Sequence, residues 1–439
     1  MHIDLPSAAI QAIEILESCG HRAYVVGGCV RDACRGEVPH DWDMTTSARP
    51  EETAAAFAEY TVIETGIQHG TVTVLMEGQP LEITTFRTEG AYADHRHPDG
   101  VTFVRDLEAD LVRRDFTVNA MAYHPREGLI DPFGGREDIK NGILRAVGDP
   151  NRRFEEDALR ILRGLRFAAR LGYTIEEETR AAMSRKAHLL CHVSVERILE
   201  ELRKLVMGEH ILNILLTCSD VLAAVLPEIL PMVGFDQNNR HHIYDVWTHT
   251  AHAVARAESD PIVRLAMLFH DVGKPASYTV DFHGEGHFYA HAKLSGELTD
   301  AILQRLKCDT YTRTEVVWLV THHDYSIRED DRTVRRLLSR FGYDRARRLL
   351  LVKMADNASH APKYTERGAI ARRLLDRLDA VLAQQPCLTL RDLALNGRDL
   401  MAMGYTGPAI GKALQRLLDA VVDGLCENDR EALIAYLNP

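Results

Sequence analysis

The chain has 439 residues, of which 46% are hydrophobic and 26% charged, and its formal net charge is −12 at pH 7. This composition excludes a mainly disordered or collagen-like chain, and the length indicates several globular domains of roughly 100 to 200 residues each. The overall acidity argues against a general polyanion-binding protein, because contacts with phosphates need a cationic surface.

The N-terminal stretch, MHIDLPSAAIQAIEILESCG, predicts a helix. It lacks the basic start, long apolar core and small-residue cleavage site of a signal peptide. The eight cysteines are scattered and form no Cys-x-x-Cys pair. We therefore expect reduced thiols in a cytoplasmic protein without a membrane segment.

Short β-rich runs, such as AYVV at 23–26 and TVTVLM at 71–76, alternate with helical patterns up to about residue 145. Farther along, apolar residues recur at helical spacing, as in ALRILRGLRFAARLGY at 158–173. The predicted fold is therefore α+β, with a small mixed-sheet head followed by an elongated all-α body. The predicted domains are the head at 1–145, a helical neck at 146–226, a histidine-rich domain at 227–362 and a helical tail at 363–439.

The run AYVVGGCVRDACRGEVPHDWDMTT at 23–46 carries the first indication of chemistry. A strand is predicted to end at Gly27 and Gly28, where backbone N–H groups can approach a phosphate. The helix that follows favours the same anion through its N-terminal dipole, and Arg31 lies in its first turn. A purely structural turn can have the same pattern, so the pattern alone leaves both alternatives open.

Asp41 and Asp43 are two residues apart in a strand-like run, so both carboxylates are predicted to point to one face. Two carboxylates held this close favour a divalent cation, and Mg²⁺ suits oxygen ligands and substrate phosphates. A two-metal site requires a third carboxylate on a neighbouring strand, for which Glu82 is the candidate. The alternatives are a solvated loop for the aspartates and a solvent-facing side chain for Glu82.

Together, GGCVRD and HDWD resemble the polymerase-β nucleotidyltransferase superfamily. RRDFTVNAMA at 113–122, DPFGG at 131–135 and EEDALRILRGLRFAARLGY at 155–173 resemble its bacterial branch of tRNA nucleotidyltransferases (CCA-adding enzymes) and poly(A) polymerases. The resemblance implies an enzyme that binds the tRNA 3′ end and adds or repairs its CCA from CTP and ATP. It also implies Mg²⁺ at the head and pyrophosphate as the product.

The resemblance assigns the catalytic metals to Asp41 and Asp43, and nucleotide selection to Asp157 and Arg160. Residues three apart on a helix share a face, and a carboxylate accepts a hydrogen bond from the amino group that cytosine and adenine carry. The alternative for Asp157 and Arg160 is an exposed salt bridge within one helix. The other nucleotide contacts that the resemblance implies are Gly27, Gly28, Arg31, Arg114, Asp115, Asn119 and Arg163.

The segment at 89–111 resembles the flexible loop that this family associates with the switch from C to A addition. Asp94, Arg96 and Pro98 are present in it, which argues against an enzyme that adds only CC. A plain surface loop is the alternative.

Many of the 21 histidines lie between residues 240 and 325. The set His249, His270, Asp271 and Asp356 resembles the ligands of HD-type metal phosphohydrolases, and it implies a site for Mn, Fe, Ni, Zn or Mg. Lys274 is implied near the phosphate. The residues implied for a second metal are His291, His322 and His323. The alternative is a vestigial domain whose histidines are structural.

The segment from Arg332 to Arg377 holds 13 basic and four acidic residues, which predicts either a solvated helix face or an RNA-facing surface. Two rival functions stay open. One is a poly(A) polymerase or A-adding enzyme, although the acidic C-terminal end argues against the former. The other is a phosphohydrolase or RNA-binding protein with a degenerate polymerase head.

Overall fold

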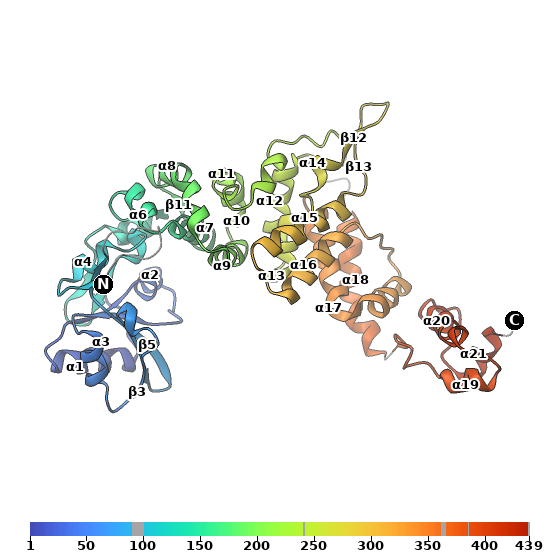
Figure 1. The fold of residues 1–439 in the computed structure, drawn as a ribbon, viewed down its shortest axis with the longest axis horizontal. Helices are drawn as coiled ribbons and strands as arrows, with labels where there is room; N and C mark the ends of the chain where they lie inside the picture. Colours follow the sequence, from blue (N-terminus) through green and yellow to red (C-terminus); the bar gives the residue numbers. More distant parts are fainter. Residues whose placement is uncertain (90–100, 240–241, 361–365, 385, 438–439) are drawn as a thin grey trace. The chain divides into compact units, whose positions relative to one another are not determined.

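The structure is a computed structural model that describes residues 1–89, 101–239, 242–360, 366–384 and 386–437. The chain forms two compact units, 1–227 and 228–439, which are described separately (Figure 1). The predicted α+β fold is confirmed, whereas the finer division into four domains stays a prediction. None of the eight cysteines, all of which lie in the described residues, forms a disulfide bond. Among the helices described, none has the length and apolar character needed to cross a membrane.

The head contains a seven-stranded mixed sheet with the order β3-β4-β5-β2-β1-β8-β9. Strands β2 and β5 run parallel, and the other neighbours run antiparallel. The strands of this sheet are β1 (Ala23–Val26), β2 (Asp43–Thr46), β3 (Thr61–Ile63), β4 (Thr71–Met76), β5 (Gln79–Thr85), β8 (Ala122–His124) and β9 (Gly128–Ile130). Two short pairs lie outside it: β6 (Arg87–Glu89) with β7 (Val101–Phe103), and β10 (Ile143–Leu144) with β11 (Thr174–Ile175).

Strand β1 is buried along its whole length because both faces of the sheet are covered. Ala23 and Val25 point into a core that also contains residues of α1 and α3. Tyr24 and Val26 point into a second core with residues of α4. This alternation follows from the two-residue period of a strand. The helices of the head are α1 (Ser7–Ser18), α2 (Gly28–Cys34), α3 (Pro50–Ala56), α4 (Leu107–Val112) and α5 (Gly135–Asn141).

The rest of the first unit is helical apart from β11 (Figure 1). Helices α7 and α9 are amphipathic, and their apolar faces pack against each other. The helices here are α6 (Pro150–Glu156), α7 (Leu159–Leu171), α8 (Glu177–Lys186), α9 (Val195–Val206), α10 (Ile211–Thr217) and α11 (Ser219–Leu222).

The second unit is helical apart from one hairpin. Its long helix α17 bends at Gly342, where a φ of 74° interrupts the helical backbone. The last three helices enclose a core of their own, which includes Leu395, Leu417 and Leu433. The elements are α12 (Val246–Arg256), α13 (Pro261–Phe269), α14 (Lys274–Ser277), β12 (Tyr278–Val280), β13 (Gly286–Phe288), α15 (His291–Arg305), α16 (Thr310–His322), α17 (Asp331–Asn357), α18 (Glu366–Ala383), α19 (Gly397–Ala402), α20 (Pro408–Val422) and α21 (Arg430–Leu437).

Candidate functional site

The turn between β1 and α2 requires glycine. Gly27 has a φ of 82°, in the region that disfavours other residues. A Cβ atom on Gly27 would lie 3.0 Å from Nη1 of Arg114. The turn thus brings the start of α2 close to an arginine from a distant segment, as an anion site requires.

Three carboxylates lie near this turn. The parallel pairing of β2 with β5 places Glu82 beside Asp43 in register. Burial, with Asp41 and Glu82 nearby, raises the pKa of Asp43 to about 6, although Arg114 opposes the shift. A divalent cation would relieve this repulsion, so the donor set fits Mg²⁺. Strand β2 begins only at Asp43, and Asp41 lies in the bend before it, so the strand alternation predicted for both residues is wrong.

Magnesium binding at the head should therefore depend on pH. Asp43 is protonated below about pH 6, and a proton competes with the metal for the same oxygen atoms. We expect the apparent Mg²⁺ affinity to weaken as the pH falls through 6, by roughly tenfold for each further pH unit. Calorimetric titration at about pH 8 and about pH 5 checks this prediction.

The matched control for that titration is Asp43→Asn, which should bind Mg²⁺ weakly and with little dependence on pH. An affinity of the unaltered protein that stays constant over the same range would contradict the prediction.

A continuous polar network links four of the predicted nucleotide contacts. Arg31 donates to Oδ1 of Asn119 at 2.6 Å, and Asn119 donates to Oδ1 of Asp115 at 3.1 Å. Arg163 donates to Oδ2 of Asp115 at 2.7 Å. Burial alone would raise the pKa of Asp115, but the Arg163 charge lowers it to about 2. Asp115 is thus ionised, and it fixes the positions of both Asn119 and Arg163.

Asp157 and Arg160 do not form the salt bridge that was the alternative to a role in nucleotide selection. Arg160 donates to Oε2 of Glu156 at 2.8 Å, and Asp157 accepts from Arg197 at 3.1 Å. The prediction that the two residues share one helix is wrong, because α6 ends at Glu156 and α7 begins at Leu159. The break leaves the backbone at Asp157 extended.

A cavity of about 600 Å³ unites these features. Its volume suits a nucleotide. The predicted residues that line it are Gly27, Gly28, Arg31, Asp41, Asp43, Arg114, Asp115, Asn119, Asp157, Arg160 and Arg163. Glu82 is not among the lining residues, and Asp94, Arg96 and Pro98 lie outside the described residues. Four further arginines that were not predicted also line the cavity: Arg113, Arg166, Arg170 and Arg197. The arginines recurring in RRDF and in 158–173 could have indicated the first three.

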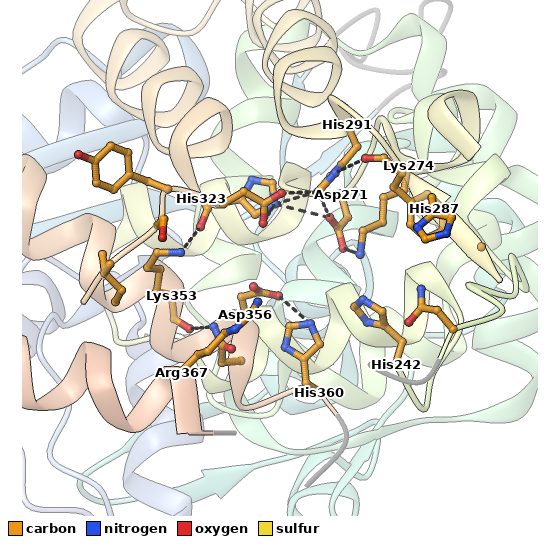
Figure 2. Close-up of a pocket in the computed structure, with 18 of the residues that line it drawn as sticks. His242, Asp271, Lys274, His287, His291, His323, Lys353, Asp356, His360 and Arg367 are labelled. Carbon is orange, nitrogen blue, oxygen red and sulfur yellow. Dashed lines mark hydrogen bonds and ion pairs between the residues drawn. The ribbon is translucent and has the colours of Figure 1, made fainter. Parts of the chain in front are cut away.

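The second unit gathers histidines and aspartates from separate helices (Figure 2). Nε2 of His249, on α12, lies 3.0 Å from Oδ1 of Asp356, on α17. Nε2 of His270 lies 3.2 Å from Oδ2 of Asp271 and 3.3 Å from Nε2 of His249. The structure thus brings the four predicted residues together, although they are widely spaced along the chain.

Asp271 also faces a second pair of histidines. Its Oδ1 atom lies 3.5 Å from Nε2 of His291 and 3.8 Å from Nε2 of His323. The structure does not bring His322 into this group, because its ring stacks on Trp318 with the centroids 4.4 Å apart. Adjacent residues on a helix point about 100° apart, so His322 and His323 cannot both face one site.

The hydrogen bonds of these histidines suit metal ligands. Nδ1 of His270, His291 and His323 lies 2.7 to 2.9 Å from the backbone carbonyl of Met267, Phe288 and Val320, respectively. A ring that donates from Nδ1 can offer its Nε2 lone pair to a metal ion, and each Nε2 is aimed at the cluster.

Asp271 is 1% exposed, and its Oδ2 atom forms an ion pair with Nζ of Lys274 at 2.7 Å. Its Oδ1 atom accepts no hydrogen bond from the described residues, although it faces His291 and His323. A buried carboxylate oxygen of this kind, among histidine nitrogens, suits a metal ligand. The donor set therefore fits divalent transition metals.

His242 and His360, which were not predicted from the sequence, join these clusters. With His249 they form a third group whose ligand atoms lie within 4.8 Å of one another. Both rings line the cavity in front of Asp271 and Asp356 (Figure 2). The histidines in HHIYDVWTHTAH and ADNASH, so close to two predicted ligands, could have indicated them.

Comparisons with known proteins agree with both units. Family models described as "Poly A polymerase head domain", "Probable RNA and SrmB- binding site of polymerase A" and "tRNA nucleotidyltransferase domain 2 putative" match residues 23–145, 172–232 and 287–437. A CCA-adding enzyme of Geobacillus stearothermophilus is 36% identical over 98% of this chain and 96% of its own length. One of Lactobacillus helveticus is 52% identical, but over only 47% of this chain and 52% of its own length.

The crystal structure of a Bacillus stearothermophilus CCA-adding enzyme in complex with CTP has a TM-score of 0.75 and 32% identity to this chain. It covers 98% of this chain, which covers 96% of it. The mixed sheet, glycine turn and carboxylate pair thus define a nucleotidyltransferase of the polymerase-β class. Within that class, the chain belongs to the family of CCA-adding enzymes, as the sequence motifs predicted.

Proposed function

We propose that this protein adds or repairs the 3′-terminal CCA of tRNA, with CTP and ATP as substrates. The observation that carries the proposal is the head cavity, which holds the carboxylate pair, the arginines and Asp157 in one place. The full-length relationship to CCA-adding enzymes supports it. Because tRNA, CTP and ATP meet in the cytoplasm, we propose that compartment as well.

In the proposed reaction, the RNA 3′-hydroxyl gives up its proton to solvent, and its oxygen forms a bond to the α-phosphorus of the nucleotide. The bond from that phosphorus to the bridging oxygen breaks, and pyrophosphate leaves. Asp41 and Asp43 would hold Mg²⁺, which neutralises developing charge when bound. The arginines of the cavity bind the triphosphate, and the network through Asp115 holds Arg163 and Asn119 in place.

The test uses tRNAs that end before the first C, after CC and after CCA, each offered one nucleotide at a time. We expect CTP to extend only the first tRNA, by two residues, and ATP to extend only the second, by one. A poly(A) polymerase would add A to all three without stopping. An A-adding enzyme would leave the first tRNA unchanged with CTP.

Nucleotide choice should depend on Asp157. Asp157→Ala removes the acceptor for the amino group of cytosine and adenine, and one such base contact provides about 1–3 kcal/mol of discrimination. We expect the preference for CTP over UTP, measured as a ratio of kcat/KM values, to fall about tenfold to a hundredfold.

Glu200→Gln is the matched control for Asp157→Ala. Glu200 is exposed and pairs with Lys204 at 3.0 Å, so its loss should leave the preference unchanged. If Asp157→Ala keeps the preference for CTP over UTP, Asp157 does not select the base.

A second activity is favoured by the histidine and aspartate clusters of the second unit. We propose that they hold divalent metals for the hydrolysis of a phosphate ester. The oxygen of a water molecule bonds to phosphorus, the ester P–O bond breaks, and the leaving oxygen takes the proton. The metal would supply an activated water molecule when bound. His249, His270, Asp271 and Asp356 would hold one metal ion, and Asp271, His291 and His323 a second.

A further inference from the structure

The basic segment from Arg332 to Arg377 is not a free cationic surface, because acidic residues from other segments neutralise much of it. The ion pairs are Arg332 and Arg336 with Asp423, Arg345 with Glu315, Arg347 with Glu258, Arg348 with Asp260, Arg373 with Glu329 and Arg377 with Asp331. The described residues of this segment also include cations without such an ion pair.

Two of them, Lys353 and Arg367, line the cavity in front of the metal clusters, which we call the HD cavity. Nζ of Lys353 donates to the carbonyl of His323 at 2.8 Å. Arg367 is exposed, and it makes no ion pair or hydrogen bond with any residue in the described part of the second unit. Figure 2 shows both cations on one side of the cavity and Lys274 on the other. Asp356 and Asp324 also line the cavity and act on Lys353. Arg367 adds a second positive charge beside Lys353, which favours an anion near the two cations.

The HD cavity is too large for one phosphate. Its volume is about 560 Å³, in the range of sites that hold a nucleotide. The metal clusters account for the phosphate that reacts. Tyr325, Ile327 and Ile370 add apolar lining, against which a sugar or a base can pack. The cavity thus offers an anion site, an apolar surface and a metal site together.

We propose that Lys353 and Arg367 form a subsite for a second phosphate. The HD cavity then prefers a nucleoside that carries a second phosphate besides the reacting one, or an RNA 3′ end whose next phosphodiester occupies the subsite, over a nucleoside monophosphate. This inference rests on the proposed phosphohydrolase function and deepens it by naming the substrate class. The guanidinium group of Arg367 can donate two N–H hydrogen bonds to the oxygens of one phosphate.

The test compares guanosine 3′-monophosphate with guanosine 3′,5′-bisphosphate on the full-length, metal-loaded protein. Guanosine is used because the proposed head pocket selects cytosine and adenine. We expect kcat/KM to be about tenfold higher for the bisphosphate, the size of one charge-assisted hydrogen bond. In Arg367→Gln the ratio of the two values should fall toward one. The product identifies which phosphate was removed.

Arg372→Gln is the matched control, because it removes the same charge from α18, where Arg372 pairs with Asp376 at 3.4 Å. It should leave the ratio unchanged. A short guanosine RNA with a 3′-phosphate distinguishes the two sources of the second phosphate. A faster reaction than that of the monophosphate assigns the subsite to RNA ends, and a faster reaction of the bisphosphate alone assigns it to free nucleotides.

Failure of the subsite and failure of the hydrolase are separable. If no substrate is hydrolysed, the proposed function fails, and equilibrium binding of the same two nucleotides still tests the subsite. Equal affinity or equal kcat/KM for the two in the unaltered protein would overturn the inference, as would a preference that Arg367→Gln leaves unchanged.

Discussion

Asp41→Ala is expected to abolish nucleotide incorporation, with a loss of roughly 10³-fold or more in single-turnover rate, the scale on which phosphoryl transfer depends on one charge partner. Burial, with the charges of Asp41 and Glu82 nearby, raises the pKa of Asp43 to about 6. A metal ion bound there would relieve this repulsion, and it would lose a ligand in the variant. Incorporation of labelled CTP into a tRNA that lacks CCA measures the effect.

The control for Asp41→Ala is Glu59→Gln, which removes an exposed carboxylate from the same unit. It should incorporate CTP at the rate of the unaltered protein. Glu82→Gln in the same assay tests the third carboxylate, and we expect a smaller loss because Glu82 is exposed and does not line the cavity. Incorporation by Asp41→Ala at a rate close to that of the unaltered protein would refute the catalytic assignment.

Asp271→Asn should have the second large effect, on the HD cavity alone. Asp271 lies between both histidine clusters, so its loss weakens both metal positions. We expect phosphatase activity to fall by more than roughly a hundredfold, since even residues that only support a metal ligand contribute 10- to 100-fold. Metal analysis of the purified protein should show the same loss, while CTP incorporation continues.

Neighbouring histidines provide the control for Asp271→Asn. His323→Ala should lower the metal content, whereas His322→Ala should not, because the His322 ring packs on Trp318 and Phe341. Equal effects of the two variants would contradict the assignment of His323. An unaltered protein that has no bound transition metal, and no phosphatase activity with added metal, would leave the vestigial interpretation standing.

Much of the head could be predicted from local patterns. The run 23–26 is β1 as expected, and 71–76 is β4. The glycine turn could be predicted from a short segment. The positive φ of Gly27 depends only on that residue and its two neighbours in the chain, and it favours glycine. The helix across Asp157 was wrong, because the sequence pattern at 155–173 does not show the break between α6 and α7.

The second unit was less predictable. His270 and Asp271 are adjacent in sequence, and their resemblance to a known ligand pair indicated the site. The role of Asp271 between two clusters depends on four other segments that approach it in space. The excess of basic residues at 332–377 did not predict a free cationic surface correctly. The acidic residues that neutralise much of it come from other parts of the unit, among them Asp423.

The amino-acid sequence by itself determined the family, the α+β class and the residue types of both sites, because these depend on motifs within short segments. Only the tertiary structure decided which side chains face each other. It turned His323 rather than His322 toward Asp271, placed Asp157 just before the helix that carries Arg160, and left Arg367 facing the HD cavity. The physical reason is that the direction of a side chain follows from the phase of its helix and from the packing of distant elements, and neither is encoded in the spacing of a motif.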